Sequence, residues 1–416
     1  MSLNQFQQGE LDAVETAITA ILARPVPHSE AVVAALRSVP RSAFAPPDTS
    51  LERLYNLDCG VVLETGSNGV PVSSLTCLGY VAEMLEMALI QHGQRVLEIG
   101  TASGFNAMLL RRLVGADGQV VTVEIDGELA SWARTMLGDN AVVVQSDGYT
   151  DLGDLGSFDR ILVSVAAPSI PALWLDRLQT GGCLIAVVQG PGACFLLRGW
   201  KDAAGGLTVD RFIHFGGWNK MIVAGERAQP WFGHDAEHPP IALDDTLDSL
   251  RHWFGGELRD SDIGVVPKNN ACMLELPQPL PESCFRSDLR QDPQCHLLWV
   301  LSRLSGVAWR LTFVCVRSND PCDRDLRHLR WVQCYGATAE LVYKSGQRLR
   351  SVDRGDTVRV ELTRAMDVWQ RCTGGTNASL VGRVDRGGVV DAHRPDEWCF
   401  VGATTTLRLR VQRGEE

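Results

Sequence analysis

Acidic residues end three successive apolar stretches of this chain, where carboxylates could accept hydrogen bonds from a bound ligand. Glu98 lies in RVLEI just ahead of a glycine loop, Glu124 ends QVVTVE, and Asp147 follows VVVQS. A carboxylate accepts several hydrogen bonds, so each could hold a pair of hydroxyls, an amino group or a cation. The loop after Glu98, GTASG, leads into an apolar helical stretch, as nucleotide-binding loops do.

The spacing of the loop glycines disfavours the common phosphate-binding motifs. Gly100 and Gly104 are separated by Thr, Ala and Ser, whereas a dinucleotide-binding fold carries GxGxxG. The chain has no GxxxxGK[ST] sequence, which the phosphate loops for ATP and GTP require. The expected ligand is therefore one without phosphates.

S-adenosylmethionine meets these requirements, because it carries an amino group, a carboxylate and a sulfonium cation. Glu98 can place the cationic groups, and the two glycines let the backbone approach the methionine part. Glu124 is expected to accept from the ribose hydroxyls, and Asp147 from the adenine amino group. The predicted cofactor-binding residues are Glu98, Gly100, Thr101, Ser103, Gly104, Glu124, Ile125, Asp147 and Gly148.

Each of these residues also has a purely structural interpretation. The glycines could serve turns alone, and Glu124 and Asp147 could be solvated strand ends or helix caps. Three strand ends in succession, each with the required polar type, favour the cofactor site over that alternative.

The elements that would carry these residues alternate between strand and helix over 95–190. Near-continuous Val, Ile and Leu runs such as RVLEI and GCLIAVV are separated by amphipathic stretches such as FNAMLLRRLV. This alternation predicts an α/β fold, with a parallel sheet covered on both faces. Two helices are expected ahead of it, one over 29–36 that Ser29 caps, and one from 75 to a stop at Gly93.

A stretch rich in proline and polar residues, ERAQPWFGHDAEHPP over 226–240, marks a change of character. Beyond it, runs such as AWRLTFVCV and TTTLRLRVQ predict strands mixed with some helix. We therefore expect two domains, 1–228 with the α/β sheet and 229–416 with an α+β fold.

Composition limits the partners. The 416 residues carry a formal net charge of −11, which argues against nucleic acid and anionic membranes. The first residues lack the pattern of a signal peptide and no apolar run could span a bilayer, so a cytoplasmic location is expected. The 12 cysteines form no CxxC pair and match no common zinc spacing, so no metal site is predicted. The sequence gives no indication of the oligomeric state.

Several of these stretches resemble the protein-L-isoaspartate O-methyltransferase family, over roughly residues 25–225. SVPRSAF is similar to the end of that family's N-terminal helix, and VLEIGTASGF to its cofactor loop, with Ala102 where glycine is usual. FDRILVSVAAPSIPALWLDRLQTGGCLI is similar to its later signature. The resemblance implies a Rossmann-like class I methyltransferase sheet, S-adenosyl-L-methionine as cofactor and carboxyl O-methyl transfer.

One segment departs from the family's pattern, in which Gly-Gln-Thr-Ile-Ser-Gln-Pro precedes a long helix. Residues 69–75 read GVPVSSL here, so that Ser74 and Leu75 replace Gln-Pro. The resemblance places the serine that contacts the substrate carboxylate at Ser73. As catalytic residues we predict Ser73, to hold the carboxylate, and Ser74, to hold the neighbouring peptide backbone. Both could instead cap the helix that follows.

The C-terminal half contains WQRCTGGTN. It looks like the WxxxTGG signature of relatives found with ribosomal peptide natural products, lanthipeptides above all. The resemblance implies that 229–416 recognises a modified precursor peptide, with Trp369, Thr373, Gly374 and Gly375 as substrate-binding residues. A buried tryptophan beside a tight glycine turn is the structural alternative.

The expected function is methylation of an aspartate side chain in such a peptide, leading through a succinimide to isoaspartate. The main alternative is repair of isoaspartate in damaged proteins, against which the altered 69–75 segment argues. A peptide-binding module that keeps the cofactor domain as a scaffold is a further alternative, disfavoured by the intact acidic set. A nicotinamide-dependent oxidoreductase is disfavoured by the absence of GxGxxG.

Overall fold

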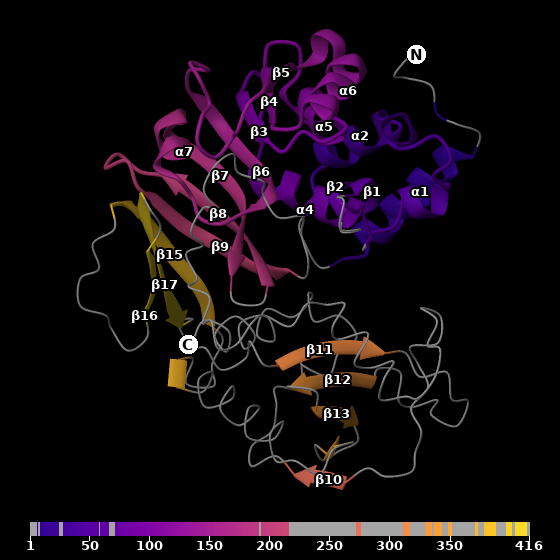
Figure 1. Cartoon of the computed structure of the whole chain (residues 1–416), viewed down its shortest axis with the longest axis vertical. Helices are drawn as coiled ribbons and strands as arrows, with labels where there is room; N and C mark the ends of the chain where they lie inside the picture. Colours follow the sequence, from indigo (N-terminus) through magenta and orange to yellow (C-terminus); the bar gives the residue numbers. More distant parts are fainter. Residues whose placement is uncertain are drawn as a thin grey trace.

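A helix-covered sheet of ten strands dominates the computed structural model (Figure 1). A two-stranded and a five-stranded sheet accompany it. The structure describes residues 6, 9–24, 28–57, 59–65, 71–190, 193–215, 272–275, 311–316, 329–334, 337–342, 348–351, 371–372, 378–387, 397–401 and 404–413.

The ten-stranded sheet is mixed, with the order β16-β17-β15-β9-β8-β7-β6-β3-β4-β5. Its parallel part follows the alternation seen in the sequence, so the predicted Rossmann-like sheet is confirmed. The parallel strands are β3 (Arg95–Ile99), β4 (Gln119–Glu124), β5 (Val142–Gln145), β6 (Phe158–Ala167) and β7 (Leu178–Gly190). Two strands that the sequence did not indicate, β8 (Ala193–Lys201) and β9 (Leu207–Phe215), continue the sheet as antiparallel neighbours.

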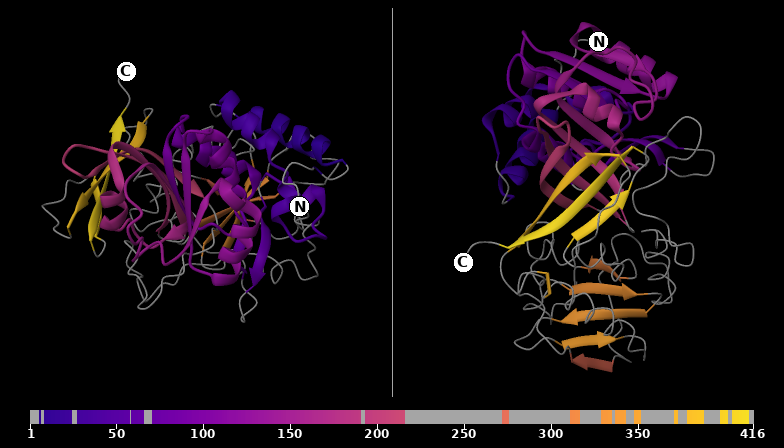
Figure 2. Two further views of the ribbon diagram at one scale, coloured as in Figure 1. Left: turned by 90° about the horizontal axis from the view of Figure 1, so that it is seen from above. Right: turned by 90° about the vertical axis from the view of Figure 1, so that its left-hand side faces the viewer.

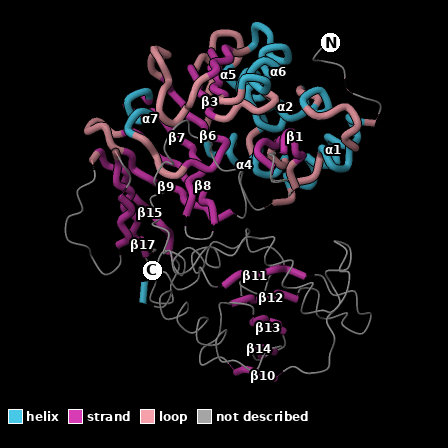
Figure 3. The backbone as a smooth tube through the Cα atoms, viewed as in Figure 1, coloured by secondary structure: helices cyan, strands magenta, loops and turns pink. Residues whose placement is uncertain are grey.

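Helices cover the parallel strands on both faces, as Figure 3 shows. One core cluster lies between the sheet and α1 (Glu10–Leu22), α2 (Glu30–Ser38), α4 (Leu78–Ala88), α5 (Phe105–Val114) and α6 (Gly127–Leu137). A second cluster, on the other face, includes Trp174 and Leu175 of α7 (Ala172–Arg177). Alternate residues of a strand enter different clusters, Val96 the first and Leu97 the second, as the pleat of a strand requires.

The short elements near the N-terminus complete the first layer. They are the 3-10 turn η1 (Arg41–Phe44) and α3 (Leu51–Leu54). A second 3-10 turn, η2 (Gly138–Asn140), follows α6. Ser29 caps α2 by accepting a hydrogen bond from the Val32 N–H at 3.3 Å, as predicted from the sequence.

Strands from the far end of the chain extend the same sheet (Figure 2, right). They are β15 (Ala378–Arg386), β16 (Glu397–Val401) and β17 (Thr405–Arg413). β15 pairs antiparallel with β9, placing Val384 opposite Leu207. Leu380, Val384, Leu407 and Leu409 join the second core cluster. The sheet therefore continues across residue 228, where we expected one domain to end.

The five-stranded sheet is antiparallel throughout, with the order β10-β14-β13-β12-β11. Its strands are β10 (Cys272–Glu275), β11 (Leu311–Val316), β12 (Leu329–Cys334), β13 (Ala337–Val342) and β14 (Arg348–Ser351). The α+β character expected for 229–416 stays a prediction. Across the described part of the chain, no helix is both long and apolar enough to cross a membrane.

Candidate active site

The loop after β3 takes a backbone conformation that depends on glycine. Gly100 and Gly104 have φ of 94° and 93°, in the left-handed region. A side chain at Gly100 would also meet the Val165 side chain at 2.8 Å. Ala102, between them, has φ of 48° without the freedom of glycine. The turn-only interpretation accounts for the φ angles, but it does not account for the polar groups around the loop.

Glu98 is fully buried at the end of β3. Its Oε2 accepts a hydrogen bond from the Thr122 hydroxyl at 2.7 Å, and the Ser164 hydroxyl lies 3.5 Å from its Oε1. Burial raises the pKa of Glu98 to about 8, although the hydrogen bond from Thr122 opposes the rise. A buried carboxyl of this kind gains most from a cationic ligand, because a positive charge would favour its ionised form.

The loop carries two buried hydroxyls, those of Thr101 and Ser103. The Thr101 and Thr122 hydroxyl oxygens are 2.6 Å apart, which links the loop through Thr122 to Glu98. The Ser103 hydroxyl is buried, and it has no hydrogen-bond partner among the residues that the structure describes. A buried hydroxyl left without a partner is costly, so Ser103 fits a site that a polar ligand completes.

Glu124 ties the end of β4 to the same loop. Its Oε2 accepts from the Ala102 N–H at 2.8 Å and its Oε1 from the Asp126 N–H at 3.1 Å. The side chain is 8 % exposed, and burial raises its pKa. Ile125, directly after it, is half-buried. Glu124 is therefore not a solvated strand end, and its lone pairs are enough to accept further hydrogen bonds.

Asp147 follows β5 and is also 8 % exposed. Its carboxylate accepts from the Tyr149 N–H at 2.9 Å and from the Thr150 hydroxyl at 2.8 Å, so it shapes the turn after the strand. Gly148 lies against Ile99, where an added side chain would meet a methyl group at 2.6 Å. The Gly148 carbonyl accepts from the Trp174 indole N–H at 2.7 Å.

The structure brings all nine predicted cofactor residues to one edge of the sheet. β3, β4 and β5 are neighbours, and backbone hydrogen bonds from Gly100 to Val123 and from Ser146 to Glu124 join their carboxyl ends. Ligands of open α/β sheets bind outside the carboxyl ends of the strands. A buried carboxyl, two glycines and an unpartnered hydroxyl fit S-adenosylmethionine, and the individual contacts stay predictions.

The two predicted catalytic serines lie in β2 (Pro71–Leu75), which pairs with β1 (Val61–Thr65). Helix α4 begins later, at Leu78, and its N-cap residue is Cys77. The helix-capping alternative is therefore wrong. Ser73 is 8 % exposed and Leu75 is buried with it, whereas Ser74 is half-buried. Since side chains alternate along a strand, the hydroxyls of Ser73 and Ser74 point to opposite faces.

Arg41 is a central residue that the sequence analysis did not single out, although it lies in the quoted SVPRSAF. It is fully buried, and burial lowers its pKa to about 10. Its guanidinium donates to the Thr76 carbonyl, directly after β2, and lies 4.8 Å from the centre of the Phe105 ring. Phe105 is the first residue of α5, next to Gly104. Arg41 thus joins the strand of Ser73 to the helix of the cofactor loop.

Trp369, Thr373, Gly374 and Gly375 lie outside the described residues. Their neighbour Cys372 is described, and it packs against the second core cluster. The described part of the chain holds no group of three or more His, Cys, Asp or Glu side chains arranged to bind a metal ion.

Comparison with known proteins agrees with this arrangement. The family model for protein-L-isoaspartate(D-aspartate) O-methyltransferase matches residues 14–211. A protein-L-isoaspartate O-methyltransferase of Methanothermobacter thermautotrophicus is 35% identical over 164 residues, which are 38% of this chain and 72% of the relative. One of Rhodopseudomonas palustris is 39% identical over 181 residues, 42% of this chain and 79% of the relative.

Two solved structures with similar names align less closely. A protein-L-isoaspartate O-methyltransferase has a TM-score of 0.46 at 18% identity, covering 98% of this chain and 100% of its own. A Plasmodium falciparum protein described as a putative protein-L-isoaspartate O-methyltransferase, in complex with S-adenosyl-L-homocysteine, has a TM-score of 0.43 at 16% identity. It covers 51% of this chain and 98% of its own. On the sequence matches, the chain belongs to the protein-L-isoaspartate O-methyltransferase family.

Proposed function

We propose that this enzyme methylates the side-chain carboxylate of an aspartate in a ribosomally synthesised, modified peptide of the lanthipeptide type. Membership of the family establishes the type of reaction and the cofactor. The chain is a carboxyl O-methyltransferase of the protein-L-isoaspartate type, and its cofactor is S-adenosyl-L-methionine. The proposal concerns the substrate and its fate.

The observation that carries the proposal is that strands from beyond the family match belong to the catalytic sheet. The match ends at residue 211, and β15, β16 and β17 lie beyond it, yet they complete the catalytic sheet. The relatives from Methanothermobacter thermautotrophicus and Rhodopseudomonas palustris align with only 38% and 42% of this chain. An extension built into the catalytic sheet favours a dedicated substrate, and the WxxxTGG sequence just ahead of β15 favours a modified precursor peptide.

The altered segment at β2 supports the same conclusion. Ser73 and Leu75 occupy the buried face of the strand, in a stretch where the family pattern ends in Gln-Pro. A proline in that place would fix the backbone and remove an N–H donor. Leu75 carries an N–H that proline lacks and lies opposite Val61 of β1, so the substitution alters the strand that holds Ser73.

The chain's own residues have a limited task in the transfer. An aspartate carboxylate is ionised at neutral pH and needs no general base, since its ordinary pKa is about 3.9. The cofactor supplies a methyl group on a sulfonium, which is an electrophile with a neutral leaving group. Ser73 donates a hydrogen bond to one carboxylate oxygen and leaves the other aligned for attack. Ser74 is proposed to contact the peptide backbone from the other face of β2.

The methyl ester prepares the second step. The backbone nitrogen of the next residue attacks the ester carbonyl, a C–N bond forms, and the C–O bond to the methoxy group breaks. The amide proton leaves with methoxide as methanol, and the product is a succinimide. Hydrolysis of the ring then gives isoaspartate or aspartate, and no side chain of the enzyme is needed for it.

Intact mass spectrometry tests the proposal. The full chain is incubated with S-adenosyl-L-methionine and each of three peptides: a linear isoaspartyl peptide, an unmodified precursor and the modified precursor from the same gene neighbourhood. Gain of a methyl group followed by loss of methanol is expected on the aspartate of the modified precursor. Ser73→Ala run in parallel identifies transfer that depends on the proposed site.

The opposite result is equally informative. Methylation of the isoaspartyl peptide alone would overturn the proposal in favour of repair. Ser73, which matches the serine of the family's pattern, is compatible with that activity. Equal methylation of the modified and unmodified precursors would show that prior modification is not recognised.

A further inference from the structure

Two loops at the carboxyl edge of the sheet are joined across the ends of other strands. The loop after β5 carries Tyr149, whose hydroxyl lies 2.6 Å from that of Ser169 in the loop after β6. Trp174 of α7 donates to the Gly148 carbonyl and packs edge-on against Tyr149, with ring centres 6.0 Å apart. β3 and β4 lie between β5 and β6 in the sheet. The two loops therefore connect beside the strand ends that carry Glu98 and Glu124.

The loop after β6 is itself held from the far end of the chain. The Thr405 hydroxyl, at the start of β17, donates to the Ile170 carbonyl, and Thr405 is fully buried. The preceding residue, Thr404, accepts from the Ala172 N–H at 2.9 Å. Ala172 is the first residue of α7, whose N-cap residue Pro171 has no side-chain cap. A threonine 232 positions away therefore satisfies a helix N–H that the helix cannot satisfy itself.

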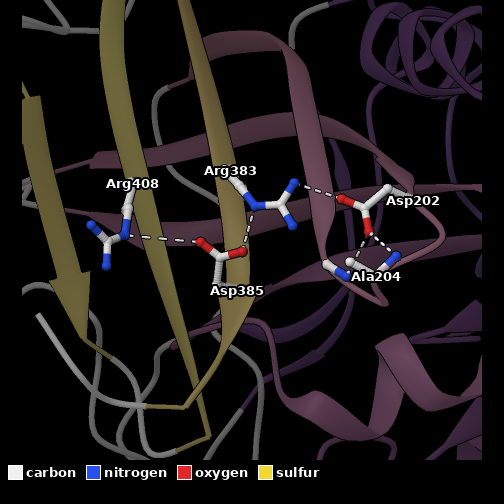
Figure 4. Close-up of polar contacts among 6 residues, drawn as sticks. Asp202, Ala204, Arg383, Asp385 and Arg408 are labelled. Atoms are coloured by element: carbon white, nitrogen blue, oxygen red, sulfur yellow. Dashed lines mark hydrogen bonds and ion pairs between the residues drawn. The ribbon is translucent and has the colours of Figure 1, made fainter. Parts of the chain in front are cut away.

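An ion pair holds β15, the neighbour of β17 in the sheet, to the turn between β8 and β9 (Figure 4). Arg383 of β15 donates to Asp202 at 2.6 Å, and Asp202 also accepts from the Ala204 and Gly206 N–H groups of the turn. Arg386 pairs with Asp176 of α7. The position of β17 against α7 is thus fixed by strand pairing and by charge, and not by the two threonines alone.

We propose that Thr405 and Thr404 are positioning residues of the cofactor site. They fix the loop after β6 and the start of α7. Ser169 and Trp174 then hold the segment from Asp147 to Tyr149 in its turn. The inference rests on the proposed assignment of Asp147 and Gly148 to the cofactor. It gives the C-terminal strands an indirect part in cofactor binding, through residues that the family match does not include.

The matched pair Thr405→Val and Thr406→Val tests it. Thr406 is 1 % exposed, adjacent on the same strand, and its hydroxyl donates to the Gly387 carbonyl at 2.8 Å, within the C-terminal strands. Both variants lose one buried hydrogen bond and should lower the melting temperature alike. Only Thr405→Val should weaken binding of S-adenosylhomocysteine, by about three- to tenfold in Kd by calorimetry. Thr405→Ser, which keeps the hydroxyl, should restore the affinity.

Equal affinities for the two valine variants would overturn the inference. If Thr405→Val does not fold, the exposed Thr404 replaces it in the test. Thr404→Ala removes the acceptor for the Ala172 N–H and should weaken binding, and an unchanged Kd would overturn the inference. The double variant Thr404→Ala with Tyr149→Phe should weaken binding less than the effects of the two single substitutions combined. Both substitutions act through the same loop contact. Binding to the unaltered chain reports on the proposed site itself, so the two failures are distinguishable.

Discussion

Methyl transfer should depend most on the hydroxyl of Ser73, which is buried in β2 on the side of the first core cluster. Ser73→Ala removes one hydrogen bond to a charged carboxylate, a contribution of about 1.5–3 kcal/mol. We expect kcat/KM to fall about 10- to 150-fold. The Kd for S-adenosylhomocysteine should not change, because the predicted cofactor residues lie at the carboxyl ends of β3, β4 and β5. Mass spectrometry measures the methylation rate, and calorimetry measures the Kd.

Ser74→Ala is the matched control for this prediction. The side chain of Ser74 lies on the opposite face of the same strand, so it cannot contact the same carboxylate. We expect a smaller loss of rate than for Ser73→Ala. Equal losses would mean that both variants act by disturbing β2, and the assignment of Ser73 would be wrong.

Glu98 should make stability depend on pH in a direction opposite to that of most carboxylates. Its pKa in the folded protein is about 8, against 4.5 as the ordinary value. Between these values the folded state keeps a proton that the unfolded chain has lost. The free energy of unfolding therefore falls as the pH rises, by up to about 1.4 kcal/mol per pH unit. Below the ordinary pKa of 4.5, the contribution of Glu98 to the free energy of unfolding is fully present.

Glu98→Gln isolates this effect, because the amide cannot ionise. Urea denaturation at pH 5, 6.5 and 8 should show a flatter pH dependence for the variant than for the unaltered chain. Identical slopes would show that Glu98 is already ionised in the folded protein. Loss of cofactor affinity in the same variant would separately indicate that a negative charge is needed at this position.

Among the individual residues, the sequence analysis identified those at the ends of strands. It missed residues that contact them only in the folded protein. Glu98, Glu124 and Asp147 come together because parallel neighbours bring their carboxyl ends to one edge. Thr122 lies opposite Glu98 only through the register of β3 and β4. Arg41 reaches the site through packing of η1 against β2 and α5. Neither register nor packing is visible in local spacing.

At the scale of elements, the loop between β3 and α5 carries strain that one substitution should relieve. Ala102 adopts a φ of 48°. A non-glycine residue in this region destabilises the folded state by about 1–2 kcal/mol. Replacing it with glycine removes that cost, but the greater flexibility of glycine in the unfolded chain offsets about 0.5–1 kcal/mol of the gain. Ala102→Gly should therefore stabilise the protein by about 0.5–1 kcal/mol, as measured by urea denaturation.

Ala107→Gly, in α5, is the control for this substitution. Ala107 is fully buried in a regular helix, where glycine has no conformational advantage. This change should destabilise by about 1 kcal/mol or more. Stabilisation by neither change would show that the loop accommodates Ala102 without strain.

The errors at this scale have local causes. The stretch around Ser73 and Ser74 was open to a helix-cap interpretation, because serine is favoured at caps and the helical stripe begins close by. Pairing with β1 decides for a strand, and α4 starts at Leu78. β8 and β9 were missed because the prediction followed strand–helix alternation, and these two strands follow β7 without a helix between them.

For the whole molecule, a composition change proved a poor guide to where the catalytic sheet ends. The polar, proline-rich stretch at 226–240 suggested a boundary near 228. β15 nevertheless returns to β9, although about 160 residues separate them along the chain. The entropic cost of closing a loop grows slowly with loop length, so a long loop does not prevent such pairing. The apolar sequence of β17 does not indicate which strand it pairs with. Long-range pairing of this kind requires the structure.

The chain that ends at residue 228 should consequently be unstable. It lacks Leu380, Val384, Leu407 and Leu409, four side chains of the second core cluster. Burial of each contributes about 1.5–3 kcal/mol, so their sum is comparable with the about 5–15 kcal/mol by which a domain is stable. The truncation also leaves β9 as an open edge, which invites aggregation. We expect aggregation, or a melting temperature far below that of the full chain, in scattering and thermal-denaturation measurements.

A fragment of residues 371–416 added in trans is the control, since strand pairing does not require a continuous chain. Partial recovery of stability and of S-adenosylhomocysteine binding would show that the strands themselves are needed, and not the 229–370 segment. A truncated chain that is as stable as the full protein would contradict this account. The methyltransferase sheet would then be complete at β9, and β15–β17 would be an accessory layer. The predicted roles of Thr404 and Thr405 in cofactor binding would fall with it.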